Sequence, residues 1–203
     1  MTEKEKMLAG KLYDPSDPEL LALRAKAHRL SRDYNNVLEG EADKRHAILE
    51  AMGVHTGSNV YLQGPIYFDY GCFIEFGDNS YANFNLTILD TCPVHIGKNV
   101  FIGTGVSIVT PLHPLRYQER NIYRKDNGDY TDKEYGKPIV IENNCWIASN
   151  VTICGGVTIG EGSVIGAGSV VTKSIPKHSL AAGNPCKVIR EITENDSVYL
   201  KNL

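Results

Sequence analysis

The chain has 203 residues, of which 42% are hydrophobic and 22% are charged, a balance that favours a folded globular protein over a disordered one. Its 24 acidic and 21 basic residues give a formal net charge of −3 without a long block of one sign, so the sequence indicates neither a nucleic-acid-binding face nor an electrostatic membrane anchor. No apolar run approaches the roughly 18 residues of a membrane-spanning helix, and the first ten residues lack a signal-peptide segment. We therefore expect a cytoplasmic protein.

Residues 1–52 are predicted to be helical. The first ten residues begin with a capping-box pattern, and Asp17 and Pro18 fit the N-cap and first position of a second helix. The apolar residues of this second helix recur at spacings of three and four along one face, and they are Leu20, Leu23, Ala27, Leu30 and Tyr34. A third helix should start near residue 42 and end at Gly53. The apolar face requires a surface to pack on.

A six-residue period replaces this pattern from Ile96 onward. The chain reads "IGKNVF IGTGVS IVTPLH" and, after residue 138, "IENNCW IASNVT ICGGVT IGEGSV IGAGSV VTKSIP". An aliphatic residue opens each hexad, and a small residue often follows it. Between residues 76 and 95 the spacing is rougher, and "ILDTCPVH" carries two extra residues.

A six-residue unit is too short for a helical repeat and suits a short strand with a tight turn, its aliphatic side chain pointing inward. Three units would close a triangular coil of about 18 residues that hydrogen-bonds to the next coil about 4.8 Å away. A β-sandwich would show two-residue alternation instead. The five cysteines lack a CxxC pair, and we expect them to be small interior side chains rather than disulfide or zinc partners.

The hexads stop at His113, which lies between Pro111 and Pro114. A lone histidine is usually an ordinary surface or core residue, but this one marks the point where an ordered repeat gives way to a polar stretch. Residues 114–138 contain four tyrosines among many charges. Such a stretch is too long and polar for an accidental connection, so we expect an arm over an active site or over a neighbouring subunit.

Several stretches resemble the maltose and galactoside O-acetyltransferases of the hexapeptide-repeat family. They are "EKMLAGKLYDP" near the start, "YFDYG" at 67–71, "YANFNLTILD" at 81–90, "NNCWIASNVTI" from 143 and "VIGAGSVVTKSIP" from 164. The resemblance covers nearly the whole chain. It implies a mainly β fold, a left-handed parallel β-helix with an N-terminal α-helical segment and a long loop extruded from the coils. The implied divisions are an acceptor-side helical segment, a β-helix domain with its loop, and a C-terminal tail, at residues 1–52, 53–190 (loop 114–138) and 191–203.

The resemblance implies an acetyl-CoA-dependent O-acetyltransferase that acts on a hydroxyl of a maltose, glucose or galactoside type of sugar. It implies direct transfer in a ternary complex and a homotrimer with sites between subunits. Such a reaction needs a base for the hydroxyl proton and a stabiliser for the tetrahedral oxyanion, and histidine is well matched to the first task. His113 matches the family's catalytic histidine, and Asn83 matches the asparagine that holds the acceptor and helps to stabilise the oxyanion.

Further residues match binding positions of the family. Asp69 in "YFDYG" matches a contact to the acceptor sugar, and Asp14 in "LYDPSDP" lies near a family aspartate that reaches it. The positions that line the acetyl-CoA channel or lie near the nucleotide phosphates are Trp146, Ser149, Ala167, Thr172, Lys173, Lys187 and Arg190. The resemblance implies no metal.

Three alternatives remain open at this stage. The acceptor could be a non-sugar hydroxyl such as that of an antibiotic. A metal lyase of the γ-carbonic anhydrase type is a second possibility, because His95 and His113 are 18 positions apart and would stack about 4.8 Å from each other in a regular coil; a third histidine ligand would be needed. A non-catalytic scaffold is the third, and it would leave His113 and Asn83 without a task.

Overall fold

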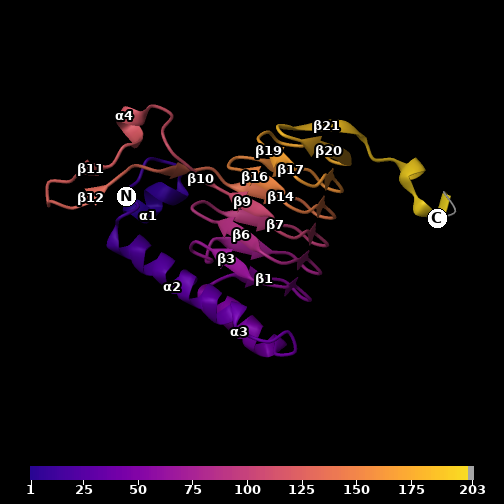
Figure 1. The fold of residues 1–203 in the computed structure, drawn as a ribbon, viewed down its shortest axis with the longest axis horizontal. Coiled ribbons are helices and arrows are strands. Elements are labelled where there is room, and N and C mark those ends of the chain that lie inside the picture. Colours follow the sequence, from indigo (N-terminus) through magenta and orange to yellow (C-terminus); the bar gives the residue numbers. More distant parts are fainter. Residues whose placement is uncertain (201–203) are drawn as a thin grey trace.

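The computed structural model describes residues 1–200 and shows a left-handed parallel β-helix with helices packed against its first coils (Figure 1). The helices are α1 (Glu3–Leu8), α2 (Pro18–Asn35) and α3 (Ala42–Met52). Within this range no helix is long and apolar enough to cross a membrane. The predicted tail 191–203 is described only as far as residue 200, and its last three residues lie outside the described part.

The coils have three faces, which we number in the order in which the chain visits them. The first face contains β1 (His55–Thr56), β4 (Ile74–Phe76), β7 (Val94–Ile96), β14 (Ile139–Ile141) and β17 (Thr158–Ile159). The second contains β2 (Tyr61–Leu62), β5 (Tyr81–Ala82), β8 (Phe101–Ile102), β15 (Trp146–Ile147), β18 (Val164–Ile165), β20 (Ser179–Gly183) and β21 (Cys186–Glu191). The third contains β3 (Ile66–Phe68), β6 (Leu86–Leu89), β9 (Ser107–Val109), β16 (Thr152–Cys154) and β19 (Val170–Val171).

The hexad prediction is confirmed in the interior. The residue that opens each hexad, from Ile96 to Val171, is at most 1% exposed. Each of these side chains stacks on its counterpart in the next coil, and burying one such side chain contributes about 1.5–3 kcal/mol. All five cysteines are free, and three of them are buried.

The coil length differs from the predicted value in the first coils. The later coils advance by 18 residues, as when Ile141 pairs with Ile159, whereas Ile74 pairs with Val94, a step of 20. The extra residues lie at the corner after the third face, which we call the third corner. There the buried carboxylate of Asp90 accepts the backbone N–H groups of Tyr70 (2.8 Å) and Phe73 (3.3 Å), so the wider turn is held by a side chain.

Asparagine allows the tight bends elsewhere. At the first corner, between the first and second faces, Asn59, Asn79, Asn99 and Asn144 adopt a positive φ of 54–62°. Asparagine tolerates this left-handed conformation better than most residues. The amides of neighbouring coils also bond to one another, for example Asn99 Nδ2 to Asn144 Oδ1 at 3.2 Å.

The helices close the open end of the first coil. The capping box of α1 and the Asp17 cap of α2 are present, and α3 ends in a left-handed Gly53, as predicted. α2 packs on β3, and its buried Ala27 and Tyr34 join Leu49 and Met52 of α3 in the main core. At the other end of the β-helix, β21 folds back antiparallel on β20.

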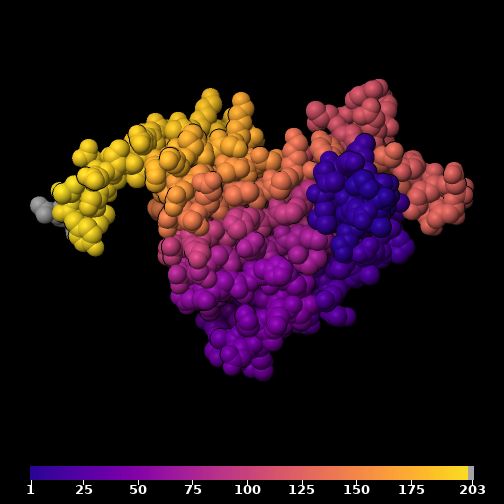
Figure 2. Space-filling view, turned by 180° about the vertical axis from the view of Figure 1, so that it is seen from behind, coloured from indigo at the N-terminus to yellow at the C-terminus, as the bar shows by residue number. Residues whose placement is uncertain are grey.

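The polar stretch after His113 leaves the β-helix at the third corner and returns to the first face. Together with residues 110–113 it forms the segment 110–138 between β9 and β14, which we call the excursion. The excursion contains β10 (Pro111–Leu112), α4 (Tyr117–Arg120), β11 (Tyr123–Arg124), β12 (Tyr130–Thr131) and β13 (Tyr135–Gly136). β10 pairs with β13, and β11 with β12, so the excursion is two short antiparallel ladders in series. In Figure 2 this loop and the C-terminal tail project from opposite sides of the body.

Candidate active site

Seven of the predicted site residues divide between two corners of the β-helix. Asp69 follows β3, His113 follows β10, and Thr172 and Lys173 follow β19, so all four lie at the third corner. Asn83, Ser149 and Ala167 follow strands of the second face and lie at the second corner, between the second and third faces. The strands of the third face separate these corners, and a strand of three or four residues spans about 10 Å or more. One chain therefore does not bring Asn83 and His113 together.

His113 lies between two carboxylates that the sequence interpretation missed. Its Nδ1 is 3.5 Å from Asp132 Oδ2 and its Nε2 is 3.9 Å from Glu134 Oε1. The imidazole side chain is 45% exposed, so it is accessible to a ligand. The sequence did contain one signal for them. Asp132 and Glu134 are two positions apart, and residues i and i+2 of an extended segment point to the same side. Only the folded loop reveals that this side faces His113.

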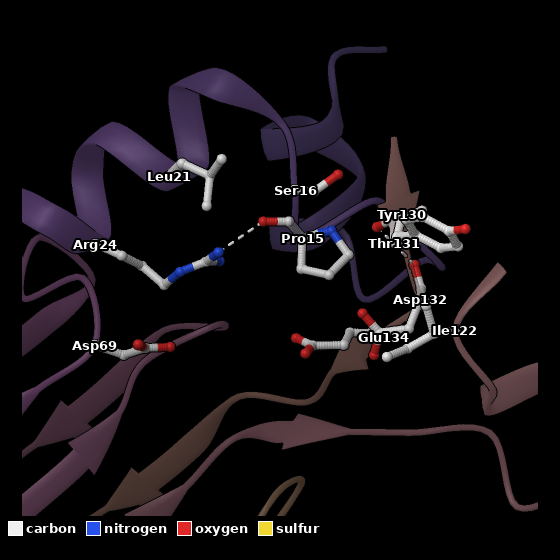
Figure 3. Close-up of a pocket in the computed structure, with 10 residues that line it drawn as sticks. All are labelled: Pro15, Ser16, Leu21, Arg24, Asp69, Ile122, Tyr130, Thr131, Asp132 and Glu134. Carbon is white, nitrogen blue, oxygen red and sulfur yellow. Dashed lines mark hydrogen bonds between the residues drawn. The ribbon is translucent and has the colours of Figure 1, made fainter. Parts of the chain in front are cut away.

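A cavity of about 430 Å³ lies between α2 and the excursion (Figure 3). Arg24 and Asp69 on one side face Asp132 and Glu134 on the other. The remaining lining residues are Pro15, Ser16, Leu21, Ile122, Tyr130 and Thr131. Walls of this composition offer hydrogen-bond donors and acceptors as well as apolar surface, which suits a small polyhydroxylated molecule.

Arg24 is fixed in this cavity by two hydrogen bonds. Its Nη1 donates to the Tyr70 hydroxyl and its Nη2 to the Pro15 carbonyl oxygen, each at 2.7 Å. Burial opposes the charge of Arg24, but Tyr70 and Asp69 outweigh it and raise the pKa of the guanidinium. A fixed cation thus stands opposite the carboxylates beside His113.

Asp69, predicted to contact an acceptor, lines this cavity. Its Oδ1 is 3.3 Å from His28 Nε2. It also borders a second, smaller cavity of about 320 Å³ beside α2. The position is consistent with the predicted contact, which stays a prediction.

Asp14 does not line the cavity but ties the excursion to the N-terminal segment. Its carboxylate accepts hydrogen bonds from Thr131 Oγ1, Ser16 Oγ (2.7 Å) and Lys125 Nζ (3.0 Å). We call these four residues the Asp14 cluster. Burial opposes the ionisation of Asp14, but these hydrogen bonds outweigh it and hold the pKa of the carboxyl well below its usual range. A direct contact between Asp14 and a sugar stays a prediction, and the role visible here is the attachment of the loop.

The side-chain oxygen of Asn83 accepts a hydrogen bond, and its nitrogen can donate to a ligand. Its Oδ1 accepts the backbone N–H of Phe84 at 2.7 Å. The amide nitrogen of Asn83 carries two protons that it can donate. A donor of this kind at a corner suits the stabilisation of an oxyanion.

The predicted cofactor residues lie at both corners and on the second face. Trp146 is 54% exposed on β15, and its neighbours in register are Phe101 and Val164. Lys187 and Arg190 lie on β21. Arg190 donates from Nη1 and Nη2 to the two carboxylate oxygens of Asp196, each at 2.7 Å, so a phosphate would have to displace this carboxylate.

The stacking of His95 on His113, which the metal-lyase alternative would need, does not occur. His95 lies on the first face, where it pairs with Glu75 and Val140. His113 does not reach this face, because the chain leaves the β-helix at the third corner before it completes the coil.

Ligand atoms of His113, Asp132 and Glu134 lie within 4.8 Å of one another, a group that could in principle hold a cation. The two carboxylates nevertheless face opposite ring nitrogens, an arrangement that suits an imidazole held between two acids better than a metal centre.

Three family models match the chain. The maltose acetyltransferase hexapeptide capping motif matches residues 6–52, the bacterial transferase hexapeptide matches 138–173, and the hexapeptide repeat of succinyl-transferase matches 91–111. The galactoside O-acetyltransferase of Escherichia coli K12 is 43% identical over 98% of this chain and 94% of its own length. The chain belongs to the maltose and galactoside O-acetyltransferase family.

Solved structures of this acetyltransferase family share the fold. A maltose O-acetyltransferase from Clostridium difficile is 44% identical, covers 96% of this chain and 99% of its own, and superposes with a TM-score of 0.86. A galactoside acetyltransferase in complex with coenzyme A is 43% identical over 97% and 94% of the two chains, with a TM-score of 0.87. A hexapeptide-repeat acetyltransferase from Vibrio cholerae complexed with acetyl coenzyme A is 36% identical over 96% and 100%, with a TM-score of 0.82.

Proposed function

We propose that the protein transfers the acetyl group of acetyl-CoA to a hydroxyl group of a small sugar. The observation that carries the proposal is the position of His113 beside Asp132 and Glu134, two carboxylates that line a polar cavity of sugar size. Family membership supplies the reaction class, and relatives bound to coenzyme A or acetyl coenzyme A support the donor.

His113 acts as the general base in this proposal. The acceptor hydroxyl gives its proton to a ring nitrogen, and its oxygen forms a bond to the carbonyl carbon of the thioester. The tetrahedral intermediate then collapses, the carbon–sulfur bond breaks, and the imidazolium returns the proton to the coenzyme A thiolate. Transfer is direct, so no residue of the chain is acetylated. Asp132 beside Nδ1 favours the tautomer that leaves Nε2 free to accept the proton.

The complete site is proposed to form between two chains of a homotrimer. His113 of one chain and Asn83 of the next would meet, because the two residues occupy different corners of the same β-helix. The second face supports an assembly: Tyr61, Phe101 and Trp146 are 36%, 56% and 54% exposed in one row across its coils. An exposed apolar row of this kind marks a protein contact. The first face instead presents His55, Glu75 and His95.

The test is a panel of sugars and simple alcohols with acetyl-CoA, scored by release of the free coenzyme A thiol. We expect the highest kcat/KM with a glucoside, maltoside or galactoside. A preference for a non-sugar alcohol would replace the proposed acceptor, and thiol release that no acceptor stimulates would contradict the transfer itself.

A further inference from the structure

Tyr13 reaches the candidate active site from the N-terminal segment, although it does not itself line the cavity. Its backbone N–H donates to the Glu134 carbonyl oxygen at 3.0 Å, and its hydroxyl donates to Glu134 Oε2 at 2.6 Å. One residue thus holds both the backbone and the side chain of Glu134. The two residues are 121 positions apart in the sequence, so this contact joins the N-terminal segment to the excursion.

The Tyr13 ring is fixed by burial. It is 2% exposed and packs in a small cluster with Met7, Leu20 and Tyr70. Burial, followed by the hydrogen bond to Glu134, raises the pKa of Tyr13 far above its ordinary value, so the hydroxyl remains a donor across the working pH range. A protonated donor in a rigid position fixes one oxygen of the carboxylate and leaves the other to face the cavity.

The second oxygen of Glu134 faces the proposed base. Glu134 Oε1 is 3.9 Å from His113 Nε2, which is too far for a hydrogen bond and wide enough for ligand oxygens beside both atoms. The reacting hydroxyl has a single proton, and in the proposed mechanism His113 accepts it. A carboxylate only accepts hydrogen bonds, so Glu134 must accept one from a different hydroxyl, which keeps its proton. The adjacent hydroxyl of a sugar ring is the nearest such group.

We propose that Tyr13 is a positioning residue of this enzyme, which holds Glu134 so that its carboxylate binds the hydroxyl next to the one that His113 deprotonates. The inference rests on the proposed acetyltransferase function. It defines the acceptor class further, as sugars or polyols with two adjacent hydroxyl groups, and it assigns a role to an N-terminal residue that touches neither substrate.

The test is a double-mutant cycle with Tyr13→Phe and Glu134→Ala. Tyr13→Phe keeps the ring and the backbone bridge but removes the donor. We expect kcat/KM for the best sugar to fall about tenfold to a hundredfold, the range for losing one hydrogen bond to a charged group, while KM for acetyl-CoA stays unchanged. In the Glu134→Ala background the same substitution should have no further effect, because its partner is absent.

Tyr34→Phe is the matched control. Tyr34 is also 2% exposed, and its hydroxyl donates to the Leu62 carbonyl oxygen at 2.6 Å, outside the cavity. Tyr34→Phe should lower the free energy of unfolding about as much as Tyr13→Phe does, without changing kcat/KM. Monodeoxy forms of the best sugar give a second measurement, because the effect of Tyr13→Phe should disappear for the form that lacks the adjacent hydroxyl.

The outcomes separate this inference from the proposed function. A parent protein that acetylates no acceptor rejects both. An active parent with additive effects of the two substitutions, or an equal effect of Tyr13→Phe on every deoxy sugar, rejects the role of Tyr13 alone.

Discussion

At the scale of single residues, His113 is the side chain on which turnover should depend most. His113→Ala should lower kcat about a hundredfold to ten-thousandfold, the usual effect of removing a positioned base. Acetyl-CoA binding, measured by calorimetry, should be unchanged because His113 is not one of the predicted cofactor-binding residues. A folded variant that turns over at the parent rate would return His113 to the status of an ordinary surface histidine.

Asp90 gives a stability effect with a defined pH window. Burial, opposed by backbone hydrogen bonds, raises the pKa of Asp90 to about 6. The folded state then binds more protons than the unfolded state between about pH 4 and 6, so this contribution to stability falls as the pH rises through that window and is constant above it. Urea unfolding of the parent and of Asp90→Asn should show a difference in unfolding free energy that decreases by up to about 3 kcal/mol from pH 4 to pH 7.

The exposed Asp126 provides a control for this measurement. Asp126→Asn makes the same change of side chain at an exposed position and corrects for the loss of one carboxyl group from the chain. If the unfolding free energy of Asp90→Asn, compared with that of Asp126→Asn, does not change with pH in this window, the raised pKa of Asp90 is contradicted.

The sequence predicted some site residues and missed others for a physical reason. His113 is visible because it ends a repeat, and a repeat imposes the same constraint in every coil. Asp132 and Glu134 lie in a segment without a period, and they reach His113 only because β13 pairs with β10. Such a pairing depends on contacts with the N-terminal segment, which no local pattern encodes.

At the scale of elements, the helices and later coils followed from the sequence, since capping residues and hexads act locally. The greater length of the first coils was predicted only in part. The extra residues at the third corner interrupt the six-residue period, but the sequence does not show which interaction stabilises the wider turn. The structure shows that Asp90, one coil after Tyr70 and Phe73, supplies the support by accepting their backbone N–H groups.

The Asp14 cluster should control the mobility of the excursion. Asp14→Asn removes the charge that holds Lys125, so we expect faster amide hydrogen exchange in residues 123–131 and a several-fold higher KM for the sugar. The low pKa of Asp14 means that its contribution is complete above the ordinary aspartate value of about 3.9 and is lost as the pH falls below it. Asp129→Asn, in the same hairpin, is the control. Unchanged exchange in Asp14→Asn would show that other contacts suffice to hold the loop.

At the scale of the whole molecule, the two-corner division of the site predicts complementation between inactive chains. His113→Ala and Asn83→Ala should each be nearly inactive alone. The two variants are mixed in equal amounts, unfolded and reassembled into trimers. Roughly a quarter of the sites should then be active, because in a closed ring this is the fraction at which an intact His113 meets an intact Asn83 of the next chain. Mass photometry would confirm trimers, and no recovery in mixed trimers would place both residues in one chain.

The excursion between β9 and β14 also bears on how this fold tolerates change. It lengthens the step between paired strands of the first face to 45 residues, from Val94 to Ile139, where the coil before it takes 20. Loop-closure entropy grows only with the logarithm of length, so the longer step costs about 0.7 kcal/mol more than the shorter one. An insertion that carries half of the residues lining the cavity therefore costs the folding of the β-helix very little. New acceptor pockets can arise by exchanging this single segment while the stacked coils, and whatever they bind, stay as they are.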